Sequence, residues 1–171
     1  RDNATLYRWL ILNDISEAPE NWSQPGFDDS AWNYSAAPFG DSENDGVVPG
    51  TIWDTKGSSP YENDTLLVRH RFDLPVGTIL SAEINVAFSN YCTPYLNGNL
   101  IYSGDGEEGA NGHSMQYWNS DGTEDISPTM FDSRDNLLAI YARDYVWSVN
   151  QNQQWLDPRI TATHNPFNTT T

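Results

Sequence analysis

Several aromatic side chains stand in polar, turn-rich segments, where they could stack on the apolar face of a sugar ring. The candidates are Trp53, the neighbouring pair Tyr117 and Trp118, and Trp147, which is followed by the amide of Asn150. A flat ring beside planar amides can hold a sugar by stacking and by hydrogen bonds to its hydroxyls. Each ring could equally close a loop over a hydrophobic core. These five residues are therefore candidates for binding either a glycan or a protein partner.

Acidic residues alternate in the stretch DSENDG, which ends at a glycine. Asp41, Glu43 and Asp45 offer three carboxylates at alternate positions, an arrangement that lets a loop wrap a hard cation such as Ca²⁺. The bidentate acid that an EF-hand loop carries at its end is missing, and residues 119–124 (NSDGTE) repeat only part of the pattern. We expect a structural Ca²⁺ and no other cofactor, with solvated acidic turns as the alternative.

The sequence gives little support for a catalytic site. His70, His113 and His164 have no metal-ligand spacing, and no Gly-x-Ser-x-Gly elbow is present. The 24 acidic residues make carboxylate pairs so common that they carry no information about glycosidase chemistry. We therefore expect no enzyme activity and assign no catalytic residue.

The charge of the chain restricts its partners. Eight basic against 24 acidic residues give a formal net charge of −16, which would repel nucleic-acid phosphates and anionic membrane surfaces. No apolar run is long enough to insert into a bilayer. The expected partners are glycans or neighbouring protein subunits.

Sequons and residue usage favour an extracellular location, either secreted or on the cell surface. Asn-x-Ser/Thr sequons, the acceptor signal for N-glycosylation, occur at Asn3, Asn21, Asn33, Asn63 and Asn168. Lysine occurs once, and the chain starts without Met, which is typical of a processed product or a piece of a larger protein. The only cysteine, Cys92, lies in an apolar run and is expected to be a buried, inert thiol.

Short apolar runs separated by turn residues predict an all-β protein. The clearest alternation lies in residues 80–88, where Ala82, Ile84, Val86 and Phe88 share one face. Asn97-Gly98 is a strong hairpin signal, and Pro94 before it implies a sheet edge or a bulge. Strands are expected at residues 5–13, 66–74, 80–88, 91–95, 100–102, 137–143 and 155–163, with long loops at 41–61 and 103–125. We expect one domain over residues 1–163 and a terminal tail or linker over 164–171.

The stretch from Trp22 to Gly40 combines aromatic anchors with turn residues. We expect Phe27 and Trp32, together with Trp9, to lie in the core. The Asp28-Asp29-Ser30 corner between Phe27 and Trp32 is expected to turn the chain and seat these rings. Arg69 and Arg71 are expected to pair with buried or partly buried carboxylates rather than with a ligand.

The chain carries seven motifs in a fixed order: Trp9, Pro25-Gly26-Phe27-Asp28-Asp29-Ser30-Ala31-Trp32, Ala37-Pro38-Phe39-Gly40, Arg69-His70-Arg71-Phe72, Tyr95-Leu96-Asn97-Gly98, Asn136-Leu137-Leu138-Ala139 and Leu156-Asp157-Pro158-Arg159-Ile160. In this order they resemble the galactose-binding-like jelly-roll domain, a β-sandwich of carbohydrate-binding-module type found in glycosidases and bacterial surface proteins. The resemblance covers nearly the whole chain. It departs from the family pattern at Asn90-Tyr91, where the family often has two Asp residues.

The resemblance implies an antiparallel jelly-roll β-sandwich of about eight strands. Its shared residues are scaffold, whereas ligand sites in the family lie on variable loops, so function needs its own argument. The expected function is a non-catalytic extracellular carbohydrate-binding or adhesion module of a larger secreted or surface protein. The alternative is a structural subunit of an extracellular fibre, appendage or surface assembly, whose aromatic loops contact neighbouring subunits.

Overall fold

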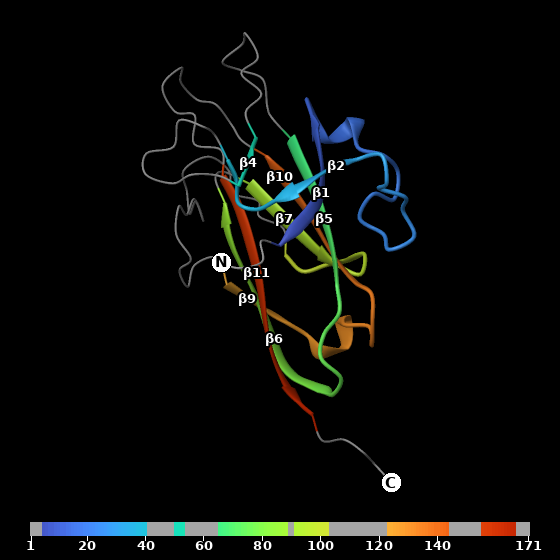
Figure 1. Ribbon diagram of the computed structural model, residues 1–171, viewed down its shortest axis with the longest axis vertical. Helices are drawn as coiled ribbons and strands as arrows, with labels where there is room; N and C mark the ends of the chain where they lie inside the picture. Colours follow the sequence, from blue (N-terminus) through green and yellow to red (C-terminus); the bar gives the residue numbers. More distant parts are fainter. Residues whose placement is uncertain are drawn as a thin grey trace.

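The computed structural model describes residues 5–40, 50–53, 65–88, 91–102, 123–143 and 155–166, and they form two packed β-sheets (Figure 1). The all-β antiparallel sandwich predicted from the sequence is confirmed. None of the described elements is a helix long and apolar enough to span a bilayer. The elements are β1 (Leu6–Leu12), η1 (Ile15–Glu17), β2 (Asn33–Ala36), β3 (Phe39–Gly40), β4 (Thr51–Ile52), β5 (Thr65–Phe72), β6 (Thr78–Phe88), β7 (Tyr91–Leu96), β8 (Asn99–Leu100), β9 (Thr123–Ile126), η3 (Pro128–Met130), β10 (Asn136–Arg143) and β11 (Trp155–Asn165).

The six-stranded sheet, here called sheet A, has the order β2-β1-β5-β10-β7-β8, with every neighbouring pair antiparallel. The five-stranded sheet B has the order β4-β3-β11-β6-β9, and its only parallel pair joins β3 to β4. Strands adjacent in sheet A are mostly distant in sequence. β5, for example, pairs with both β1 and β10.

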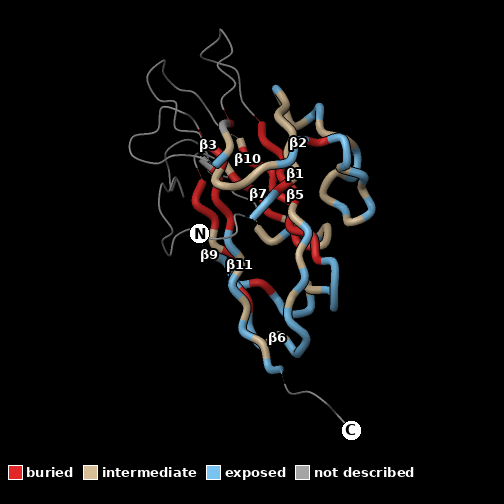
Figure 2. Tube along the Cα trace, in the orientation of Figure 1, coloured by how far each residue is buried: buried red, intermediate tan, exposed pale blue. Residues whose placement is uncertain are grey.

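The main core fills the space between the two sheets (Figure 2). Alternation explains which side chains enter it: Ala82, Ile84, Val86 and Phe88 of β6 are all buried there, as the sequence predicts. Leu66 and Val68 of β5 face them from sheet A. A second, smaller cluster lies on the outer face of sheet A and contains Trp32, Leu67 and Tyr141.

Several strand boundaries differ from the sequence prediction, and β2 and β3 were not predicted as strands. The expected long loops at 41–61 and 103–125 contain β4 and most of β9, short strands that lack a readable alternation. β11 also includes His164 and Asn165, past the strand end predicted at residue 163. A bulge allows this extension, because the register shifts after Thr163 so that His164 pairs with Ile79.

The β7–β8 hairpin forms as predicted. Asn97 and Gly98 both have positive φ, at 50° and 80°, as the tight hairpin turn requires. The position of Pro94 explains why a proline is tolerated in β7. Its carbonyl accepts a 3.0 Å hydrogen bond from the N–H of Ile101, which lies just beyond β8. In an antiparallel strand the N–H of a residue points to the same side as its carbonyl, so the missing N–H faces the side where the ladder to β8 ends.

Candidate functional site

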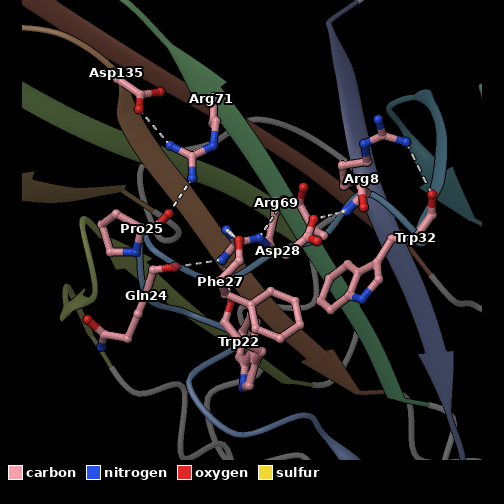
Figure 3. Close-up of polar contacts among 12 residues, drawn as sticks. Arg8, Trp22, Gln24, Pro25, Phe27, Asp28, Trp32, Arg69, Arg71 and Asp135 are labelled. Atoms are coloured by element: carbon pink, nitrogen blue, oxygen red, sulfur yellow. Dashed lines mark hydrogen bonds and ion pairs between the residues drawn. The ribbon is translucent and has the colours of Figure 1, made fainter.

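Arg69 is buried at the centre of the outer face of sheet A and fastens the chain that crosses it. Its side chain is 0% exposed and bonds Asp29 through Nε at 2.6 Å. The same guanidinium donates to the backbone carbonyls of Trp22, Gln24 and Phe27 (Figure 3). We call residues 22–32 the cap segment. Its carbonyls converge on one cation, so Arg69 fixes its path over the sheet.

The edges of the cap segment are fastened separately. Arg71 bonds Asp135 at 2.8 Å and also donates to the carbonyl of Pro25 (Figure 3). Gln24 Nε2 donates to the carbonyl of Gly98 at 3.4 Å, which ties the cap segment to the β7–β8 turn. Arg69 therefore pairs with a partly buried carboxylate, as expected, whereas Arg71 pairs with the exposed carboxylate of Asp135.

The corner that follows Phe27 works as predicted. Asp28 Oδ1 accepts a 3.0 Å hydrogen bond from the backbone N–H of Ser30, which closes the turn and holds the pKa of this exposed carboxyl below its usual value. The rings of Phe27 and Trp32 then lie 5.6 Å apart. Trp32 is buried, and Phe27 packs against the same outer cluster. The corner seats these rings and leaves Trp22 at the other end of the cap segment.

Four rings line the outer face of sheet A beside the cap segment, and we call Trp22, Tyr95, Tyr91 and Tyr141 the aromatic row. The rings of Trp22 and Tyr95 meet edge to face, with centroids 5.8 Å apart and planes at 84°. Those of Tyr91 and Tyr141 are 5.2 Å apart. Trp22, Tyr91 and Tyr95 are half-buried, so each keeps part of its surface in water, whereas Tyr141 is buried in the outer cluster. The row is therefore a partly exposed aromatic surface on a rigid sheet.

The surroundings of the row change the pKa of two of its tyrosines, Tyr95 and Tyr141. Burial raises the pKa of Tyr95, and the neighbouring Tyr91 raises it further. Burial also raises the pKa of Tyr141, while Arg143 acts in the opposite direction. The guanidinium of Arg143 lies 5.8 Å from the centre of the Tyr91 ring. The phenols of Tyr95 and Tyr141 therefore stay protonated near neutral pH.

The structure corrects one predicted binding residue. Trp53 is 0% exposed and packs in the main core, so its ring is not available to a ligand. Its backbone N–H donates to the carbonyl of Gly40 at 2.9 Å, which continues the β3–β4 pairing and carries the ring inward. The other candidates, Tyr117, Trp118, Trp147 and Asn150, lie outside the described residues.

The predicted calcium ligands Asp41, Glu43 and Asp45 also lie outside the described residues. Within the described ranges, no group of three or more His, Cys, Asp or Glu side chains could hold a metal ion. Of the glycosylation acceptors, Asn21 and Asn33 are described and exposed, whereas Asn3, Asn63 and Asn168 lie outside the described residues.

Cys92 is buried and free, as predicted. Burial raises the pKa of its thiol to about 12, which keeps it protonated and unreactive.

The aromatic row was missed from the sequence, although a signal was present. Tyr91 and Tyr95 stand four residues apart in one strand and therefore share a face. Trp22 is distant in sequence, and the Arg69 contact to its carbonyl helps to hold it beside Tyr95.

Comparison with solved structures extends the fold assignment. The structure is similar to a crystal structure of a β-glucosidase from Kluyveromyces marxianus, with a TM-score of 0.52 and 8% sequence identity over 94% of this chain. A β-glucuronidase from glycoside hydrolase family 2 matches with a TM-score of 0.46 and 16% identity over 80% of this chain. The chain spans 17% and 14% of these two proteins. No protein-family model and no curated protein sequence matches the chain. The chain therefore has the fold of a β-sandwich portion of a glycoside hydrolase.

Proposed function

We propose that this chain is a non-catalytic, extracellular carbohydrate-binding or adhesion module of a larger secreted or surface protein. The observation that carries the proposal is the aromatic row, in which the half-buried rings of Trp22, Tyr91 and Tyr95 are oriented before any ligand arrives. Such pre-ordering lowers the entropy cost of binding. The likeness to a portion of a β-glucosidase supports the fold of such a module and no more.

The physical basis is stacking. The apolar face of a sugar ring covers an aromatic ring, while its hydroxyls stay hydrated or bond to nearby polar groups. A net charge of −16 disfavours anionic partners and leaves neutral glycans as the favoured ligands.

A glycan array followed by calorimetry tests the proposal. We expect Tyr95→Ala to weaken binding of the glycans found on the array about tenfold, because truncating a central aromatic anchor costs about 1–2 kcal/mol. Tyr34→Ala is the matched control, since Tyr34 belongs to the same sheet but is 57% exposed and outside the row. Equal binding by all three proteins would refute the assignment of the row. Binding of no glycan by the wild-type protein would refute the function.

The loop residues predicted from the sequence belong to the same proposal. Tyr117, Trp118, Trp147 and Asn150 could add contacts for a glycan or a partner, and alanine variants on the same array would test each one.

A structural Ca²⁺ on Asp41, Glu43 and Asp45 is a separate proposal. We expect EDTA to lower the melting temperature and Ca²⁺ to restore it. An unchanged melting temperature in both conditions would rule the site out.

Extracellular location is tested through the sequons. Asn21 and Asn33 are exposed, which is compatible with attached glycans. We expect the protein secreted from a eukaryotic host to lose mass on enzymatic removal of N-glycans, with less loss in the Asn21→Gln and Asn33→Gln variants. Secretion without any such mass change would count against a glycoprotein.

The alternative function, a structural subunit of an extracellular assembly, is favoured by a different observation. Leu6 and Tyr34 are 41% and 57% exposed on β1 and on the edge strand β2, away from the aromatic row. Exposed apolar groups on a sheet edge suit contacts between subunits. Analytical ultracentrifugation distinguishes the two functions, because a monomer at high concentration excludes self-assembly through this edge.

A further inference from the structure

The apolar surface that a ligand can reach lies at one end of the aromatic row. Trp22 and Tyr95 are half-buried there, and Leu100, which pairs with Tyr95 across β7 and β8, is 51% exposed. Along β7 and β10 this surface stops, because Thr93 and Ala139, the neighbours of Tyr95 on the same face, are 4% and 0% exposed. We call Trp22, Tyr95 and Leu100 the terminal patch.

The terminal patch is about as wide as one sugar ring. Residues that pair across antiparallel strands have Cα atoms about 5 Å apart, and Tyr95 and Leu100 are such a pair. The rings of Trp22 and Tyr95 have centroids 5.8 Å apart and planes at 84°, so they form a corner rather than one flat surface. A single pyranose ring fits such a corner, whereas a chain of sugars needs a longer open surface.

Polar atoms around the terminal patch can bond to hydroxyls. Gln24 Nε2 donates to the carbonyl of Gly98 at 3.4 Å, and because a carbonyl only accepts, Oε1 is left as an acceptor. A glycine is needed under this amide, since a Cβ at position 98 would lie 2.3 Å from Gln24 Oε1. Within the described ranges, Trp22 Nε1 and the Tyr95 hydroxyl make no hydrogen bond to the protein, and neither atom is buried. The patch therefore offers a donor, an acceptor and a hydroxyl, and all three are uncharged.

We propose that the terminal patch binds a single neutral sugar unit. The apolar face of the sugar lies on the rings and on Leu100, and its hydroxyls bond to Gln24 Oε1, Trp22 Nε1 and the Tyr95 hydroxyl. This inference rests on the proposed carbohydrate-binding function and adds the place of the site and the number of units that it holds. The uncharged atoms of the patch and the net charge of −16 favour a neutral sugar. In a longer glycan, the other units extend into solvent.

The experiment is an NMR titration of the intact, isotope-labelled protein with sugars of increasing length. The probes are the methyl glycosides of glucose, galactose and xylose and the corresponding oligosaccharides of two to four units. For one unit we expect a dissociation constant on the order of 1 mM, because few atoms make contact. Within a series that binds, the affinity should rise no more than about fourfold from one unit to four, the statistical factor for four equivalent units. The indole N–H signal of Trp22 should shift as the sugar binds.

Variants locate the site on the sheet. Tyr95→Ala should weaken binding about tenfold, and Gln24→Met, which removes the acceptor but keeps the length of the side chain, about threefold. Tyr91→Ala should weaken binding less than Tyr95→Ala does, because the buried Thr93 lies between the two tyrosines on β7. Tyr34→Ala is again the matched control and should leave the affinity unchanged.

The outcomes separate the two proposals. An affinity that rises about tenfold or more with chain length overturns the one-unit site but leaves carbohydrate binding intact. So does a loss in Tyr91→Ala as large as that in Tyr95→Ala, or a Trp22 signal that stays in place while a sugar binds. Binding of no sugar, here or on the array, overturns both proposals. Self-association that Tyr95→Ala abolishes would also overturn both, because it assigns the patch to a second copy of the chain. The length dependence and the Trp22 signal are measured on the wild-type protein, so a poorly folded variant cannot leave the question open.

Discussion

The ion pair between Arg69 and Asp29 offers the sharpest test of how the cap segment is held. Asp29→Asn removes the charge but keeps the shape, and it leaves a guanidinium that is 0% exposed without its counter-ion. Removing one partner of a buried pair costs about 3–5 kcal/mol. Arg69 keeps three carbonyl acceptors and Asp29 is 18% exposed, so we expect the lower limit, about 3 kcal/mol.

Urea unfolding followed by tryptophan fluorescence measures this loss, and calorimetry gives the melting temperature. For a domain of this size the expected loss lowers the melting temperature by about 6–12 °C. Asp135→Asn is the matched control, since its pair with Arg71 is 38% and 70% exposed at the two side chains. An exposed pair contributes at most about 1 kcal/mol, so this variant should remain close to the wild type.

A double variant separates the ion pair from the carbonyl contacts. Replacing both charges, in Arg69→Met with Asp29→Leu, removes the buried cation but leaves the carbonyls of Trp22, Gln24 and Phe27 without their donor. We expect the double variant to be at least as unstable as Asp29→Asn. A double variant as stable as the wild type would refute the reasoning. So would equal losses in Asp29→Asn and Asp135→Asn.

Three further predictions follow from individual side chains. Cys92 should resist a thiol reagent at pH 8 in the folded protein and react in urea, because burial raises its pKa to about 12; rapid labelling of the folded protein would contradict this. Burial lowers the pKa of His70 below its unfolded value near 6.5. The free energy of unfolding should therefore keep its maximum contribution from His70 above pH 6.5 and decrease as the pH falls through the lowered pKa. His70→Gln should flatten the pH dependence of chemical unfolding in that range, and an unchanged slope would count against it. Thr93→Val should raise the free energy of unfolding by about 1 kcal/mol, because Thr93 Oγ1 is buried without a hydrogen-bond partner; a loss of stability would show that the hydroxyl is satisfied.

The sandwich was predictable because its long strands carry clear local signals. Alternation on β6 identified its buried face, and Asn97-Gly98 located the hairpin. The short strands β2, β3, β4 and β9 were missed, since pairing with a neighbouring strand, rather than their own residues, makes them strands.

The aromatic candidates were harder to rank for the same reason. Nothing around Trp53 distinguishes a buried ring from an exposed one, and its burial is decided by the pairing of β3 with β4. Tyr91 and Tyr95 share a face by spacing alone, but which face remains open cannot be read until both layers are placed. The position of Trp22 depends on Arg69, which lies 47 residues away in sequence.

The strand order of sheet A also has a consequence for how the chain must fold. β1 pairs with β5, β5 pairs with β10, and β10 pairs with β7. The central pairings of sheet A therefore join distant parts of the chain. Topologies dominated by such long-range pairings fold slowly, because loop closure must precede the stabilising contacts. During synthesis, the edge of β5 that pairs with β10 stays unpaired until residues 136–143 have emerged. We therefore expect the nascent chain to be prone to aggregation until β10 has been synthesised. A fragment ending before β10 should bind chaperones rather than fold.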